Sequence, residues 1–221
     1  MNKLNQTLLE FELKQNFAYD DFFVSKCNFF AFNLIETWPK WEKNILNIYG
    51  EKFSGKSHLS EIFKKKNKAI IIKKEEINDN FFNKIRFYEN IILDNLNYVN
   101  NENILYSIFN FTEQYNKYLI INSIEPLISF NFLLPDLKSR IKNCIFAKID
   151  KPDDDMIFAL ILKHFSDRQI KIEKKMIEYI TKRIERSYGK ILDFIYKVDQ
   201  FSLINKKPID YKSIKKILEE N

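Results

Sequence analysis

Residues 50–57 are Gly50-Glu51-Lys52-Phe53-Ser54-Gly55-Lys56-Ser57, and this octapeptide fits the phosphate-loop pattern G-x-x-x-x-G-K-[ST]. The apolar run Ile45–Tyr49 before it predicts a strand, and the residues after it predict a helix over Ser57–Lys66. A chance glycine turn before a helix is the alternative. We favour the phosphate loop because strand, loop and helix follow in the required order, and because two of the chain's three glycines lie here.

Each residue type in the loop suits a phosphate group. Gly50 and Gly55 allow a tight turn that points consecutive N–H groups at phosphate oxygens. The Lys56 ammonium would reach the β- and γ-phosphates, and the Ser57 hydroxyl would lie on Mg²⁺. The nucleotide contacts expected from this segment are Gly50, Ser54, Gly55, Lys56, Ser57 and His58.

The composition is that of a globular protein. The 221 residues, 45% hydrophobic and 30% charged, suffice for one large domain or for a domain with a small companion. No apolar run approaches the length of a membrane span, and the early acids Glu10 and Glu12 argue against a signal peptide. Cys27 and Cys144 lie far apart, which predicts buried, reduced thiols in a cytoplasmic protein.

The net charge of +6 favours partners that carry phosphate, such as a nucleotide or a nucleic acid. The clearest basic run is Lys64-Lys65-Lys66-Asn67-Lys68, at the end of the helix that follows the loop. Cations at a helix C-terminus face the negative end of the macrodipole, which explains the run without a partner. A DNA-binding patch is the alternative.

The pattern of apolar residues divides the chain into three parts: a tail over residues 1–18, an α/β nucleotide-binding domain over 19–150 and an all-helical lid domain over 151–221. Short apolar runs rich in isoleucine suit strands that are buried on both faces of a parallel sheet. We expect a five-stranded parallel sheet, with strands at Ile45–Tyr49, Ala69–Lys73, Asn90–Leu93, Tyr118–Asn122 and Cys144–Ile149.

After Pro152 the apolar spacing changes to three and four, which indicates helices. Asp153 suits a helix start, and Asp210 suits the N-cap of the last helix. The expected helices are Asp154–Phe165, Glu173–Glu185, Lys190–Ile204 and Tyr211–Glu219.

A carboxylate for the metal follows the third predicted strand. Asp94 ends the run Ile91-Ile92-Leu93-Asp94, and a carboxylate at this place can hold the Mg²⁺ hydration shell beside the γ-phosphate. A turn residue is the alternative for an isolated aspartate. The next residue, Asn95, is an amide and cannot act as a base, so we expect slow intrinsic hydrolysis.

From about Tyr19 onward the chain resembles the AAA+ ATPases, and among them the DnaA/Hda family. The segment Tyr19-Asp20-Asp21-Phe22-Phe23-Val24, followed by Asn28, is similar to the family's nucleotide-base segment F-D-x-F-V-V-G-x-x-N, with Ser25 in place of the glycine. The resemblance implies that Phe23 and Val24 border the adenine. Aromatic residues that only fill the core are the alternative.

Three further residues receive roles from this resemblance. Asn122 ends the fourth predicted strand, where the family has a polar sensor of the γ-phosphate. Arg140 ends a segment, Leu134–Arg140, that is similar to L-P-D-L-x-S-R, which implies an arginine finger acting on nucleotide held by a neighbouring protomer. Lys190 stands in place of the lid's sensor arginine, so the coupling of the lid to the nucleotide is left open.

The resemblance is nearer to the Hda-like members, which lack the C-terminal DNA-binding domain of DnaA, because this sequence ends at Asn221 after the last expected helix. Those members begin with a motif that docks on the sliding clamp of the replicative polymerase. Residues 6–11 fit its form Q-x-x-L-x-F: Gln6 would hydrogen-bond, and Leu9 and Phe11 would fill an apolar pocket. A disordered tail or a first strand is the alternative.

The resemblance therefore implies an adenine-nucleotide-binding regulator of chromosome replication initiation. It would bind ADP or ATP with Mg²⁺, dock on the clamp, reach DNA through the clamp, and present Arg140 to ATP-bound DnaA. A self-hydrolysing ATPase or helicase loader acting on DNA is one alternative, and an adaptor with a vestigial nucleotide site is the other. The sequence leaves open which nucleotide works, whether the protein contacts DNA directly and whether it forms a homo-oligomer.

Overall fold

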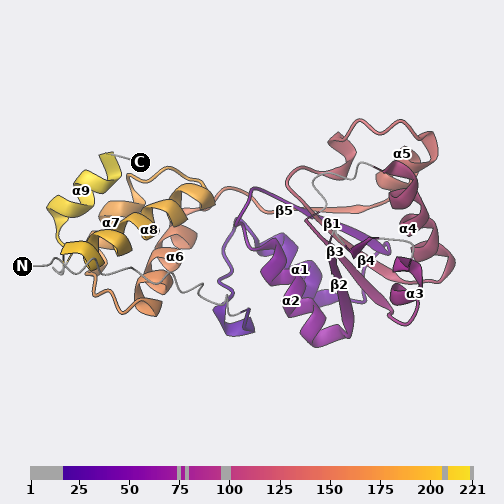
Figure 1. The fold of residues 1–221 in the computed structure, drawn as a ribbon, viewed down its shortest axis with the longest axis horizontal. Helices are drawn as coiled ribbons and strands as arrows, with labels where there is room; N and C mark the ends of the chain where they lie inside the picture. The colour runs from indigo at the N-terminus through magenta and orange to yellow at the C-terminus, as the bar shows by residue number, and fades with distance from the viewer. Residues whose placement is uncertain (1–16, 74–75, 78–79, 96–100, 206–208, 220–221) are drawn as a thin grey trace, which may run out of the picture.

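The computed structural model describes residues 17–73, 76–77, 80–95, 101–205 and 209–219. Figure 1 shows an α/β part and a separate group of helices, joined by the chain that follows β5. The proposed boundary at residue 150 falls between β5 and the first helix of this group.

The sheet has five parallel strands in the order β2-β3-β4-β1-β5. The predicted strands are confirmed, each to within one residue at either end. The strands are β1 at Ile45–Tyr49, β2 at Ala69–Lys73, β3 at Asn90–Asp94, β4 at Tyr118–Ser123 and β5 at Ile145–Lys148.

Helices cover both faces of the sheet, as buried parallel strands require (Figure 1). One face packs against α1 (Phe29–Thr37) and α2 (Lys56–Asn67), and the other packs against α3 (Phe81–Ile85), α4 (Glu102–Gln114) and α5 (Pro135–Lys142). Two short 3-10 helices, η1 (Tyr19–Asp21) and η3 (Leu127–Ser129), lie in the connections.

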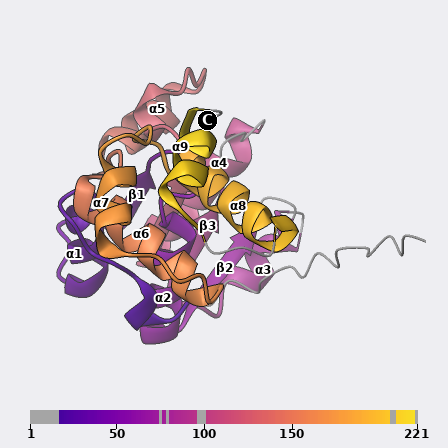
Figure 2. The same cartoon turned by 90° about the vertical axis from the view of Figure 1, so that its left-hand side faces the viewer.

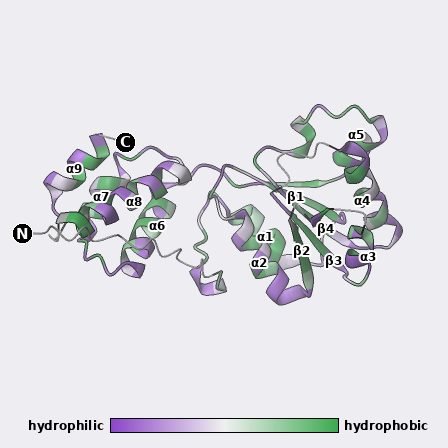
Figure 3. Cartoon of the chain, viewed as in Figure 1, coloured by the Kyte–Doolittle hydropathy of each residue, from purple (hydrophilic) through white to green (hydrophobic). Residues whose placement is uncertain are grey.

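Alternate residues of each strand belong to different cores because side chains of a strand point to opposite faces in turn. In β4, Leu119 and Ile121 pack on the α3–α5 side, whereas Ile120 packs on the α1–α2 side. All three are fully buried. The sheet therefore separates two apolar layers. Figure 3 shows its strands largely in green, the colour of hydrophobic residues.

The C-terminal part is helical, as predicted. Its helices are α6 at Asp154–Asp167, α7 at Lys174–Thr181, α8 at Tyr188–Asn205 and α9 at Tyr211–Glu219. They enclose their own core, which includes the buried Phe165, Ile180 and Phe194. Figure 2 shows the four helices grouped together. Helix α7 ends earlier than the expected Glu185, and the chain turns through residues 182–187 to begin α8 before Lys190.

The predicted helix starts carry the expected caps. The Asp153 side chain accepts a hydrogen bond of 2.8 Å from the Met156 N–H. Asp210 accepts 2.8 Å from the Ser213 N–H and 2.6 Å from the Ser213 hydroxyl. These bonds to Ser213 hold the pKa of the Asp210 carboxyl below its ordinary value.

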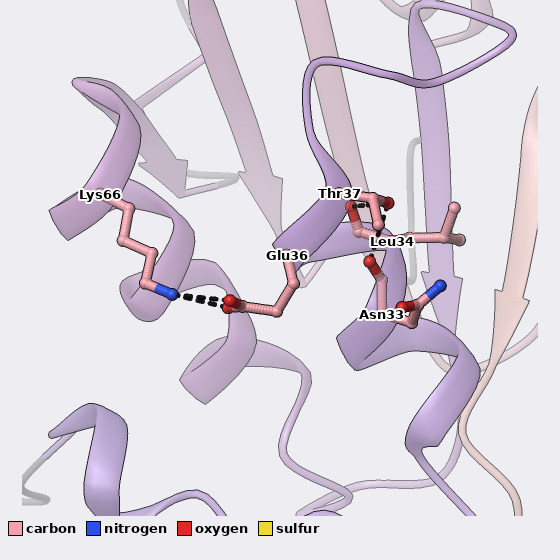
Figure 4. Close-up of polar contacts among 5 residues, drawn as sticks. All are labelled: Asn33, Leu34, Glu36, Thr37 and Lys66. Carbon is pink, nitrogen blue, oxygen red and sulfur yellow. Dashed lines mark hydrogen bonds and ion pairs between the residues drawn. The ribbon is translucent and has the colours of Figure 1, made fainter.

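The basic run at the end of α2 makes contacts within the chain. Lys66 lies 2.7 Å from Glu36 of α1, as Figure 4 shows, and 4.2 Å from the centre of the Tyr19 ring. Figure 4 also shows the Thr37 hydroxyl donating to the Asn33 carbonyl at 2.8 Å, a bond that closes the last turn of α1. These contacts favour the structural interpretation of the run over a DNA-binding patch.

Cys27 and Cys144 are both buried and unbridged, as expected. Burial raises the pKa of the Cys144 thiol to about 12. Within the described ranges, no helix has the length and apolar character needed to cross a membrane.

Candidate nucleotide-binding site

The loop between β1 and α2 needs glycine at both ends. Gly55 has φ of +95°, and a Cβ there would lie 3.1 Å from a ring carbon of Phe22. A Cβ on Gly50 would come within 2.7 Å of the Ile149 carbonyl oxygen. The glycines that the pattern requires are therefore fixed by a left-handed backbone at one position and by close packing at both.

The centre of the loop has a strained residue that the sequence did not reveal. Phe53 has φ of +66°, and its side chain is 61% exposed. A left-handed backbone costs a residue with a Cβ about 1–2 kcal/mol. Because the Phe53 ring is mostly exposed, its burial does not compensate for that cost. The phosphate-loop pattern leaves this position unspecified, so it gave no signal.

Phe53→Gly should therefore stabilise the nucleotide-free protein by about 0.5–1 kcal/mol, because the relieved strain exceeds the extra entropy that glycine loses on folding. Urea unfolding measures this free energy. Phe87→Gly is the matched control: Phe87 is 86% exposed and has no positive φ, so the same exchange there should lower stability. Equal losses in both variants would contradict the assignment of strain to Phe53.

Lys56 begins α2, and its ammonium is folded against its own loop. Nζ donates to the carbonyl of Gly50 at 2.7 Å, to the carbonyl of Glu51 at 2.8 Å and to the hydroxyl of Ser54 at 3.3 Å. Burial lowers the pKa of Lys56 to about 8, while the charges of Asp94 and Glu51 act in the opposite direction. An incoming phosphate would replace carbonyl oxygens as the acceptor of this ammonium.

The order of strands brings three predicted residues together, since β3, β4 and β1 are neighbours. The Ser57 hydroxyl donates to Asp94 Oδ1 at 3.1 Å, and the Asn122 amide donates to the same oxygen at 2.8 Å. A hydroxyl oxygen beside a carboxylate is a pair that Mg²⁺ prefers, so Ser57 and Asp94 fit the expected role of holding the ion with a nucleotide.

Asn122 also forms a hydrogen bond with Ser60, a residue that the sequence did not single out. Its amide donates to the hydroxyl of Ser60 at 2.7 Å, and both side chains are fully buried. Asn122 Oδ1 is buried and has no hydrogen-bond partner in the part of the chain that the structure describes. Ser60 follows Ser57 by almost one helical turn, but serine at that place carries no signal without the fold.

The segment before α1 lies against the phosphate loop through Phe22. The Phe22 ring lies beside Gly55, whereas Phe23 is 45% exposed and Val24 is half-buried. The buried Asn28 holds this segment in place, since its amide donates to the Phe23 carbonyl at 2.9 Å. The roles of Phe23 and Val24 at the base stay predictions.

His58 contacts the same segment rather than the centre of the phosphate loop. Its Nε2 lies 2.8 Å from the Ala18 carbonyl oxygen, and its ring meets those of Phe17 and Phe22 edge-on at 5.3 and 5.1 Å. Burial lowers the pKa of the imidazole, which favours the neutral ring. Its predicted contact with the nucleotide is untested.

Helix α8 reaches the phosphate loop through Glu51. The Glu51 carboxylate accepts 2.6 Å from the Tyr188 N–H and 3.1 Å from the Ser187 hydroxyl. The Tyr188 hydroxyl in turn lies 3.2 Å from the Cys27 sulfur. Lys190 is in the first turn of this helix and is half-buried, which places the predicted sensor position near the loop.

Arg140 lies away from these residues. It is near the end of α5, just before β5, whereas the phosphate loop follows β1, the parallel neighbour of β5, so the two lie at opposite ends of these strands. The Arg140 guanidinium pairs with Glu113 of α4 and lies 5.5 Å from the centre of the Tyr106 ring. Figure 1 shows α4 and α5 on the side away from the helical part.

Helix α4 also holds the start of α5. The Glu102 carboxylate accepts hydrogen bonds from the N–H groups of Leu133, at 2.7 and 2.8 Å, and Leu134, at 2.8 Å. Pro135, the first residue of α5, has no N–H, so Glu102 binds the donors available before it. The predicted clamp-binding residues Gln6, Leu9 and Phe11 lie outside the described residues.

Solved structures share this arrangement of sheet, loop and helices. Domain III of the Thermotoga maritima replication initiation protein DnaA matches with a TM-score of 0.75 and 17% identity, covering 92% of this chain and 96% of that one. The chain has an AAA+ fold of the DnaA type. AMPPCP-bound DnaA from Aquifex aeolicus matches this DnaA-like chain with a TM-score of 0.65 and 19% identity, over 83% and 64% of the two chains.

The sequence comparison gives the same relationship. The DnaA of Caldanaerobacter subterraneus subsp. tengcongensis is 24% identical over 99% of this chain and 55% of its own length. The DnaA-like chain spans about half the length of the curated relatives it matches. No protein-family model matches it.

Proposed function

We propose that this DnaA-like chain is an adenine-nucleotide-binding regulator of chromosome replication initiation, which docks on the DNA-loaded sliding clamp and stimulates ATP hydrolysis by DnaA. The observation that carries the proposal is the separation of Arg140 from the group formed by Ser57, Asp94 and Asn122. An arginine at the opposite end of the strands is unsuited to the chain's own nucleotide and is suited to one on a second protein.

The nucleotide would lie on the loop from Gly50 to Ser57, with Lys56 on its phosphates. Mg²⁺ would supply charge neutralisation there, held through the nucleotide by Ser57 and Asp94, while Asn122 fixes the carboxylate. The structurally similar DnaA of Aquifex aeolicus binds AMPPCP, which supports nucleotide binding by this chain. Phe23, Val24 and His58 would border the base side, and Lys190 would approach from the lid.

A reconstitution tests the whole proposal. Conversion of ATP-bound DnaA to the ADP form is measured with and without this protein, and with and without clamps loaded on DNA. The proposal requires acceleration only when the protein and loaded clamps are both present. If the protein binds the clamp but does not accelerate ATP hydrolysis by DnaA, the result would favour an adaptor with a vestigial nucleotide site. The cytoplasmic location stays a prediction.

The purified protein alone should turn over ATP slowly. Asn95 follows Asp94 at the site, and an amide cannot take a proton from the attacking water. Arg140 also lies at the other end of the strands from the chain's own loop. Phosphate release in a steady-state assay measures this rate. Rapid turnover by the protein alone would instead favour the self-hydrolysing motor or helicase loader.

Joint replacement of Gln6, Leu9 and Phe11 by alanine should abolish clamp binding and leave nucleotide affinity unchanged. The motif precedes the residues that build the α/β part, so its loss removes no described contact. We expect affinity in the micromolar range, strengthened when clamp and DnaA share one DNA. Calorimetry with purified clamp decides, with Thr7→Ala in the same hexapeptide as control. No binding by the wild-type protein would overturn the clamp role.

A further inference from the structure

One carboxylate, that of Glu51, joins the phosphate loop to the lid helix α8. It accepts hydrogen bonds from the Tyr188 N–H at 2.6 Å and from the Ser187 hydroxyl at 3.1 Å. These residues follow Glu51 by 137 and 136 positions in the sequence. The Ile191 N–H donates to the Ser187 carbonyl at 3.0 Å, so Ser187 is the N-cap residue that precedes α8. A serine there ordinarily accepts from the helix N–H groups; here Ser187 donates, and Glu51 is the acceptor.

The same residue is tied to the ammonium that would hold the phosphates. The Glu51 carbonyl accepts from Lys56 Nζ at 2.8 Å, and the charge of its carboxylate raises the pKa of Lys56 against the effect of burial. A negative group brought to Lys56 therefore enters the electrostatic field of Glu51. The carboxylate of Glu51 and an entering phosphate would both be attracted to the same positive groups, which are Lys56 and the N–H groups at the start of α8.

We propose that Glu51 is a specificity-determining residue of this loop: it disfavours the nucleotide with more phosphate charge and releases α8 as that charge enters. The proposal rests on the nucleotide site of the proposed function. Repulsion by Glu51 weakens triphosphate binding more than diphosphate binding, because the triphosphate brings more negative charge to the loop that carries this carboxylate. The two effects are reciprocal. If the bond between Glu51 and the start of α8 lowers the affinity for the γ-phosphate, then a bound γ-phosphate must weaken that bond by the same factor.

Affinities for ADP and for the non-hydrolysable AMPPCP, both with Mg²⁺, test the specificity. Glu51→Gln keeps an oxygen for the Tyr188 N–H but removes the charge. It should tighten AMPPCP binding about fivefold relative to ADP, which is the upper range for one solvent-exposed charge pair. Glu61→Gln is the matched control, because Glu61 is on α2, pairs with Lys64 at 3.7 Å and has no contact with α8 among the bonds described. Its ratio of affinities should not change.

Hydrogen exchange of the backbone over residues 187–191 tests the release of α8 in the unmodified protein. Exchange should rise more with AMPPCP than with ADP, and Glu51→Gln should reduce that difference. Equal affinity ratios in the two glutamine variants, or equal exchange with both nucleotides, would overturn the inference while leaving the nucleotide site intact. Absence of binding for both nucleotides would overturn the proposed function together with it.

Discussion

Arg140→Ala should remove the stimulation of DnaA hydrolysis, by a factor on the order of 10³, while folding, nucleotide binding and clamp binding stay unchanged. The guanidinium is partly exposed, and its ion-pair partner Glu113 is more so, so the lost pair contributes little to stability. Its expected work is instead to stabilise the charge that spreads over the phosphoryl group in the active site of the partner. The rate at which ATP-bound DnaA becomes ADP-bound measures the effect.

Two companion variants make the result specific to the arginine. Arg140→Lys should fail nearly as completely, because an ammonium lacks the planar fork that bridges phosphate oxygens. Glu113→Gln removes the charge that pairs with Arg140 and should leave stimulation in place. A wild-type rate with Arg140→Ala would show that the arginine is a surface cation and that the regulatory role needs another mechanism.

Lys56→Ala should weaken the binding of ADP and ATP on the order of 10²-fold, because it deletes charge-assisted hydrogen bonds to the phosphates. Titration with labelled nucleotide measures both affinities. Lys52→Ala is the matched control, since it removes the same charge from an exposed position of the same loop and should change affinity little. Unchanged affinity with Lys56→Ala would remove the phosphate-loop assignment.

The pH dependence of binding gives a second test of Lys56. Burial sets the pKa of the free protein's ammonium at about 8, and a bound phosphate raises that pKa. Below pH 8 the proton is already in place, so affinity should be nearly constant. Above pH 8 the proton must be taken up on binding, and affinity at pH 9 should be roughly tenfold weaker than at pH 7. Lys56→Ala should lack this dependence.

The strands and the loop could be predicted because their signals are local. Buried parallel strands are short apolar runs, and the sequence places all five to within a residue of their observed ends. Ser57, Asp94 and Asn122 could be expected to meet because the carboxyl ends of parallel strands share one edge of the sheet. The caps of Asp153 and Asp210 depend on neighbours three residues away.

The contacts that depend on tertiary packing had no such signal. Three contacts join residues that no sequence spacing relates: the cap of α8 by Glu51, the ion pair of Arg140 with Glu113, and the hydrogen bond that the Asn122 amide donates to the Ser60 hydroxyl. Helix α7 ends before its apolar pattern does, since the chain turns there to begin α8. Only the fold tells which of two adjacent aromatic residues, Phe22 or Phe23, lies on the loop.

Helix α4 holds α5 at both ends, through Glu102 at its start and through Glu113 at Arg140. The two helices should therefore move as one rigid unit, in which α4 and not the loop after β1 fixes the position of Arg140. A displacement of that loop or of the lid would then leave the orientation of Arg140 unchanged. The proposed arginine finger would then act on a partner independently of whether the chain's own nucleotide site is occupied.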